Sequence, residues 1–167
     1  MTVLVVDDEP AIRHIVRRAL ESEGAAVLEA ESGDAALDLI EHHPESLDLV
    51  VTDLVMPGIS GLVMAGVLSV FLPELPVLAM SGHAMLPQPD RRLPLLNKPF
   101  TLPQLLAAVA AVRTRPRRAV GQAEEQRILA RQLRAAATAA QARATATRSE
   151  PVDLLAMARL LQASQRN

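Results

Sequence analysis

Residues 2–10 of the 167-residue chain read TVLVVDDEP, and this stretch decides the fold class. Its first five residues are mostly apolar and β-branched, which is typical of a short strand buried on both faces of a sheet. The acidic residues 7–9 end that strand, and Pro10 suits the first turn of a helix. Because apolar residues then recur at helical spacing over residues 12–20, a helix is expected directly after the strand.

The same alternation continues along the chain. Short strand-like runs lie at residues 25–29, 47–52, 76–80 and 93–96. Helical patterns lie at residues 32–43, 61–71 and 101–112. Strands that alternate with helices predict an α/β fold with parallel strands and right-handed crossovers. Five such strands predict a three-layer, doubly wound sandwich around a five-stranded parallel sheet.

Polar side chains come directly after four of the predicted strands: Asp7, Asp8, Asp53, Ser81 and Lys98. In a doubly wound sheet, functional groups collect beyond the carboxyl ends of the strands. These residues are therefore expected to converge at one edge of the sheet, although they are far apart in the sequence.

Four motifs carry these residues in order: VLVVDDEP at 3–10, TDLVMPGISG at 52–61, MSG at 80–82 and NKPF at 97–100. Together they resemble a response regulator receiver domain, over residues 2–113. The resemblance implies a flavodoxin-like fold for residues 1–113. It also implies a two-component phosphorelay, in which the chain accepts a phosphoryl group from the phosphohistidine of a sensor histidine kinase or a histidine phosphotransfer protein.

The resemblance assigns a role to each site residue. Asp53 is expected to be the phosphoacceptor, because a carboxylate can act as a nucleophile and form an aspartyl phosphate. Asp7 and Asp8, with Asp53, are expected to bind Mg²⁺ (or Mn²⁺), a hard cation that prefers oxygen ligands. The backbone carbonyl of Val55 would complete the protein's share of the ligands. Lys98 would neutralise the phosphoryl oxygens.

Ser81 is expected, on the same resemblance, to donate a hydroxyl hydrogen bond to the phosphoryl group. Simpler interpretations stay open for single residues. The acidic residues 7–9 suit the first turn of a helix because they favour its dipole, and Asp53 suits a turn. Lys98 could be a solvated charge. The combination of all of them is what favours a phosphoacceptor site.

The sequence departs from the family pattern in two places. Only sixteen residues separate Ser81 from Lys98, and they include three prolines, so the fourth helix of the receiver fold is expected to be shortened, disrupted or replaced by a loop. Family members tend to carry an aromatic residue where this chain has Leu95. The familiar aromatic switch therefore lacks its ring. His83, two residues after Ser81, is a candidate to flank the phosphoryl group.

Composition excludes several classes of function. The chain has no cysteine, which excludes disulfides, thiolate catalysis and Cys-ligated metals. Its longest apolar run, at residues 105–112, is far shorter than the ~18 residues of a membrane-spanning helix. No secretory signal pattern opens the chain. We expect a cytoplasmic phosphoprotein without membrane contact. We also expect it to be no enzyme beyond assisting its own phosphorylation and dephosphorylation.

Charge divides the chain into two parts. Residues 1–112 carry 6 Lys or Arg and 15 Asp or Glu, whereas residues 113–167 carry 11 Arg and 4 Asp or Glu. This asymmetry predicts an acidic domain followed by a basic tail. We interpret residues 114–121 as a basic linker. Residues 122–167 are interpreted as an alanine-rich helical extension, in part disordered.

One interpretation of the whole chain is preferred, and three rivals stay open. The preferred one is a response regulator whose extension packs on the acidic receiver, on a partner helix or on a second copy. The first rival is a transcription regulator whose arginines contact DNA phosphates, although no helix-turn-helix pattern is present. The second is a pseudo-receiver that acts as a constitutive interaction scaffold. An enzyme acting on small metabolites is a distant third, because no separate substrate motif appears.

Overall fold

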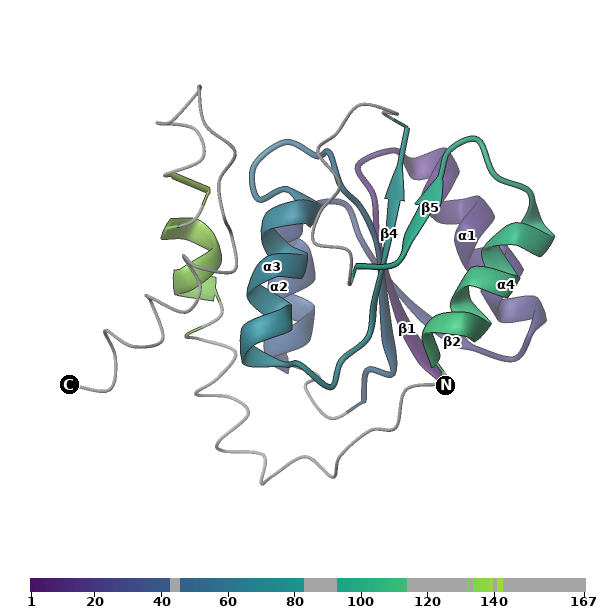
Figure 1. Cartoon of the computed structure of the whole chain (residues 1–167), viewed down its shortest axis with the longest axis horizontal. Helices are drawn as coiled ribbons and strands as arrows, with labels where there is room; N and C mark the ends of the chain where they lie inside the picture. The colour runs from purple at the N-terminus through teal and green to yellow at the C-terminus, as the bar shows by residue number, and fades with distance from the viewer. Residues whose placement is uncertain (43–45, 83–92, 114–131, 133, 140, 143–167) are drawn as a thin grey trace.

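The computed structural model describes residues 1–42, 46–82, 93–113, 132, 134–139 and 141–142 (Figure 1). A five-stranded parallel sheet forms its centre, in the order β2-β1-β3-β4-β5. Its strands are β1 (Thr2–Val6), β2 (Ala26–Ala30), β3 (Leu49–Asp53), β4 (Val77–Ser81) and β5 (Leu95–Asn97). The helices are α1 (Pro10–Ser22), α2 (Gly33–His42), α3 (Gly61–Phe71) and α4 (Leu102–Arg113). The expected flavodoxin-like α/β fold is confirmed.

Helices cover both faces of the sheet, which makes three layers (Figure 1). The α1 and α4 helices pack on one face, with a cluster of buried aliphatic residues that includes Val16, Leu20 and Leu105. The α2 and α3 helices pack on the other face, around Leu37 and Leu68. Because β1 and β3 are covered on both sides, their apolar side chains are buried as the continuous hydrophobic runs predict.

Short polar and glycine signals set the ends of the helices. The Ser32 hydroxyl accepts a hydrogen bond from the Ala35 N–H (3.2 Å) just before α2, as expected for a cap. Ser60 caps α3 in the same way, accepting from the Val63 N–H (3.3 Å). Gly24 follows α1 with a positive φ of 77°, a conformation that favours glycine.

The last strand differs from its predicted position. The sequence pattern places it at residues 93–96, whereas β5 covers Leu95–Asn97. Pro94 has no N–H to give to a sheet, and it takes part only through its carbonyl, which accepts from the Ala79 N–H (2.9 Å). The strand therefore begins after the proline. The predictions for the fourth receiver helix and for His83 fall on residues 83–92, outside the described residues.

Part of the C-terminal extension is described. Residues 132, 134–139 and 141–142 are helical. They lie beside α2 and α3, on the side away from the sheet (Figure 1). The predicted linker at 114–121 and the remainder of the extension lie outside the described residues. None of the helices that the structure describes is both long and apolar enough to cross a membrane.

Candidate functional site

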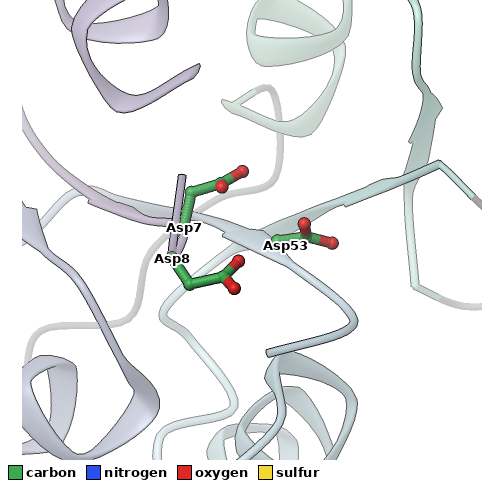
Figure 2. A group of neighbouring side chains, drawn as sticks. All are labelled: Asp7, Asp8 and Asp53. Atoms are coloured by element: carbon green, nitrogen blue, oxygen red, sulfur yellow. The ribbon is translucent and has the colours of Figure 1, made fainter. Parts of the chain in front are cut away.

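The sheet order brings the acidic residues together. Asp7 follows β1 and Asp53 ends β3, and these two strands are neighbours in parallel register. Figure 2 shows the carboxylates of Asp7, Asp8 and Asp53 gathered at the carboxyl edge of the sheet. Each offers an oxygen, and these three oxygens all lie within 4.8 Å of one another. The topology thus brings Asp53 next to Asp7 and Asp8, which lie 46 and 45 positions earlier in the chain.

The three carboxylates differ in exposure and in hydrogen bonding. Asp7 is fully buried, and its Oδ1 accepts from the Glu9 N–H (2.9 Å). Asp53 is mostly buried, and its Oδ1 accepts from the Val55 N–H (3.1 Å). Asp8 is exposed, and its carboxylate has no hydrogen-bond or ion-pair partner among the described residues. Asp8 is therefore the carboxylate most open to a ligand from solvent.

Lys98 joins the two buried carboxylates. Its Nζ lies 2.7 Å from Asp7 Oδ2 and 2.7 Å from Asp53 Oδ2. The loop after β5 delivers this side chain, and the Lys98 N–H donates to the Ser81 carbonyl (2.7 Å) at the end of β4. Burial lowers the pKa of Lys98, but the hydrogen bonds that its ammonium donates to Asp53 and Asp7, together with the negative charges of these carboxylates, outweigh it, so the pKa is raised above its ordinary value of 10.5. The ammonium form is therefore held firmly between the two carboxylates.

The alkaline stability of the protein should report this contact, because Lys98 is the only lysine and no tyrosine or cysteine is present. A pKa raised on folding stabilises the native state fully below pH 10.5. That stability is lost as pH rises through the folded-state pKa. Urea unfolding of wild type is expected to show a falling free energy in this range, with a shallower fall for Lys98→Gln. Equal slopes for both proteins would contradict the assignment.

Close backbone contact fixes the orientation of Asp53. The Thr52 hydroxyl donates to the Asp53 carbonyl (2.9 Å), and α3 begins directly against the same carbonyl. A Cβ added to Gly61, the first residue of α3, would lie 1.7 Å from that oxygen. Gly61 is part of the motif at residues 52–61, but the local sequence pattern indicates no role for it. The structure shows that only glycine lets α3 start this close to the acidic residue.

Arg13 is a second contributor that sequence reasoning missed. Its Nη1 donates to the Asp7 carbonyl (2.7 Å), and its Nε lies 4.0 Å from Glu29 Oε1. The guanidinium therefore ties the β1–α1 turn to the end of β2. Nothing in the local pattern marks Arg13 for this position, because its partners lie in the β1–α1 turn and in strand β2.

Ser81 and Val55 lie beside the cluster. Ser81 ends β4, is buried, and follows Met80, the register partner of Asp53. Val55 lies two residues after Asp53 with its side chain 46% exposed. The proposed roles of the Ser81 hydroxyl and the Val55 carbonyl stay predictions. Leu95, at the start of β5, is partly exposed where the family tends to have an aromatic ring.

The cluster has the donor set of a hard divalent cation. Mg²⁺ binds carboxylate oxygens and keeps several waters, so two or three protein ligands suffice. Asp8 has an open carboxylate, and Asp7 and Asp53 each place an oxygen within reach of it. The residues present therefore fit Mg²⁺, with Lys98 balancing part of the negative charge.

Comparison with known proteins identifies the family of this domain. The family model for the response regulator receiver domain matches residues 3–110. The chain belongs to this family. A solved receiver domain of NtrX from Brucella abortus has a TM-score of 0.62 at 30% identity, covering 68% of this chain and 99% of that one. The receiver domain of the hybrid histidine kinase CckA gives 0.58 at 31% identity, covering 68% and 100%.

Curated relatives include longer proteins. The sensor kinase CckA of Brucella abortus (strain 2308) is 40% identical over 114 residues, which is 65% of this chain and 12% of CckA. The response regulator MprA of Mycobacterium sp. (strain KMS) is 36% identical over 121 residues, 68% of this chain and 52% of MprA. This receiver therefore spans about half or less of these two relatives. The similarity concerns the receiver and not their remaining domains.

Proposed function

We propose that this receiver accepts a phosphoryl group on Asp53 in a Mg²⁺-dependent reaction and signals through protein–protein contacts. The donor is the phosphohistidine of a sensor histidine kinase or a histidine phosphotransfer protein. The observation that carries the proposal is the position of Lys98, whose Nζ binds both Asp7 and Asp53 next to the open carboxylate of Asp8. A pseudo-receiver needs no such arrangement.

The proposed reaction is a direct transfer. An oxygen of Asp53 attacks the phosphorus, an O–P bond forms as the P–N bond breaks, and the imidazole leaves with the electron pair of the broken bond. The product is an aspartyl phosphate. Mg²⁺ (or Mn²⁺), when bound by the three carboxylates and the Val55 carbonyl, would supply charge that reduces the repulsion between acceptor and phosphoryl group.

Two side chains of the protein assist in this proposal. The Lys98 ammonium lies at hydrogen-bond distance from Asp53, which supports its role in neutralising the phosphoryl oxygens. Ser81 lies one residue beyond the register partner of Asp53, which supports its role as a hydroxyl donor. The protein is a stoichiometric acceptor that assists its own phosphorylation and dephosphorylation, and in this sense we propose that it is no enzyme.

The test is to incubate the full chain with acetyl phosphate, with and without Mg²⁺, and to measure its intact mass. The expected result is the mass of one added phosphoryl group with Mg²⁺ and none in the presence of excess chelator. No addition under either condition would overturn the proposal and favour the pseudo-receiver. Addition of a phosphoryl group in the presence of excess chelator would overturn only the proposed metal dependence.

Metal binding has a separate expected effect on stability. Three neighbouring carboxylates repel one another, so a bound cation stabilises the folded state. We expect millimolar Mg²⁺ to raise the melting temperature, because a ligand at a hundred times its Kd adds about 2.7 kcal/mol. Asp8→Ala should remove most of this increase, since Asp8 has the open carboxylate.

Glu9→Ala is the matched control for Asp8→Ala. Glu9 is also exposed and adjacent in sequence, but it is not part of the three-carboxylate cluster. The Mg²⁺-induced rise in melting temperature is expected to survive in Glu9→Ala. A wild-type melting temperature that does not respond to Mg²⁺ would count against the metal site.

A further inference from the structure

The α3 helix carries no charged side chain on any face. Its sequence is GLVMAGVLSVF, and Ser69 is both its only polar side chain and its only exposed residue. A helix that packs on one face of a sheet normally buries one stripe and presents charged residues to solvent. Another element must therefore pack against the apolar side of α3 that faces away from the sheet.

The described part of the C-terminal extension lies on that side. Its residues, within the segment 132–142, are beside α2 and α3 and away from the sheet (Figure 1). Ala136 and Ala137 are 4% and 0% exposed and belong to the same buried cluster as Val67 and Leu68 of α3. Because alanine has a single methyl group, such burial requires a close approach of the segment to the receiver.

An ion pair positions the segment along α2. Arg134 forms an ion pair with Asp38, between Nη1 and Oδ1. Both side chains are about half exposed, so this pair adds little affinity and mainly selects the register of docking. The receiver is acidic and the tail is basic, and these opposite charges also favour docking of the segment on the receiver.

The contact is incomplete, which favours a reversible interaction. An open hollow remains between Glu41 of α2 and the outer side of the segment at Ala135 and Thr138. Among the described residues of the segment, the buried side chains are the small ones of Ala136 and Ala137. Withdrawal of two alanine methyl groups removes little volume from the buried cluster, so the segment can leave its site without disturbing the core of the receiver.

The two helices that form this face both begin against the segment that runs from Asp53 through the β3–α3 loop. A Cβ on Gly33, at the start of α2, would lie 2.2 Å from the Ile59 carbonyl oxygen in that loop. At the start of α3, a Cβ on Gly61 would lie even closer, 1.7 Å, to the Asp53 carbonyl oxygen. A change in the loop after Asp53 therefore reaches the first residues of both helices directly.

We propose that the outward face of α2 and α3 is a helix-docking surface that segment 132–142 of the same chain occupies reversibly, and that the state of Asp53 sets its occupancy. The docking itself is independent of the proposed phosphorylation, whereas the link to Asp53 rests on it. Leaving the face exposes an apolar surface, rimmed by Asp38 and Glu41, that fits a small-residue helix with a basic side chain.

The docking can be tested with two spin labels on the full chain, because it contains no cysteine. Labels at Ser69→Cys on α3 and Thr138→Cys on the segment occupy exposed positions. A short, narrow distance distribution is expected. Ala137→Gln should remove most of the short-distance population, and Ala135→Gln should not, because Ala135 is exposed on the same segment.

Charge reversal gives a second, independent measurement. Arg134→Asp and Asp38→Arg are each expected to reduce the short-distance population, and the double variant should restore it. A distance distribution that is unchanged by Ala137→Gln and by both charge reversals would overturn the docking. A short distance that disappears when unlabelled chain is added in excess would also overturn it, because the segment would then dock on a second copy.

The link to Asp53 is tested by adding beryllofluoride, a phosphoryl mimic, with Mg²⁺ to the labelled protein. The short-distance population is expected to change in wild type and to stay constant in Asp53→Asn. Fluorine resonances of the bound mimic show whether the site is filled. A filled site with unchanged distances overturns the link alone, whereas a site that never fills counts against the proposed function as well as the link.

Discussion

Replacing Asp53 by Asn is expected to abolish phosphorylation of the full chain completely. The amide keeps the size of the carboxylate but lacks its nucleophilic oxygen, so no aspartyl phosphate can form. Intact mass after incubation with acetyl phosphate and Mg²⁺ measures the effect. The fold should survive, because the Oδ1 atom of Asn can still accept from the Val55 N–H, as that of Asp53 does.

Asp48→Asn is the matched control for this experiment. Asp48 lies at the opposite edge of the sheet, where its Oδ2 accepts from the Thr2 N–H (2.8 Å), and an amide oxygen can replace that contact. Phosphorylation of this variant should equal that of wild type. Equal labelling of Asp53→Asn and Asp48→Asn would show that Asp53 is not the phosphoacceptor.

Gly61→Ala is expected to cause the largest loss of stability among single small substitutions near the site. The added Cβ would lie 1.7 Å from the Asp53 carbonyl and 2.6 Å from Thr52 Oγ1, so backbone must move. Overpacking of this kind costs about 1–3 kcal/mol, and we expect the upper end because the obstacle is a carbonyl rather than a flexible side chain. Urea unfolding measures the change.

Gly82→Ala provides the comparison, because a Cβ on Gly82 meets nothing within 4 Å. Its free energy of unfolding should stay within about 0.5 kcal/mol of wild type. Gly61→Ala should also phosphorylate more slowly than Gly82→Ala, since the displaced α3 shifts Asp53. Similar stability of the two variants would mean that the start of α3 adapts without cost.

Most of the fold follows from local sequence pattern. Buried apolar runs and helical periodicity predict β1 and α3 at their observed bounds and the parallel sheet around them. The motifs at 3–10 and 52–61 place Asp7, Asp8 and Asp53 at strand ends, and parallel strands bring such ends to one edge. Local pattern suffices here because hydrophobic periodicity, and with it the succession of strands and helices along the chain, depends on short stretches of sequence.

The tertiary structure decided what depends on contacts between distant residues. The ammonium of Lys98 lies between Asp7 and Asp53, which are 91 and 45 residues away in the chain. The need for glycine at position 61 arises from the approach of a neighbouring backbone, which composition does not reveal. Likewise, an alanine-rich stretch predicts a helix, but only burial of Ala136 and Ala137 against the α2–α3 layer shows where it packs. These features depend on steric fit and charge across the folded molecule, and local periodicity carries no information about either.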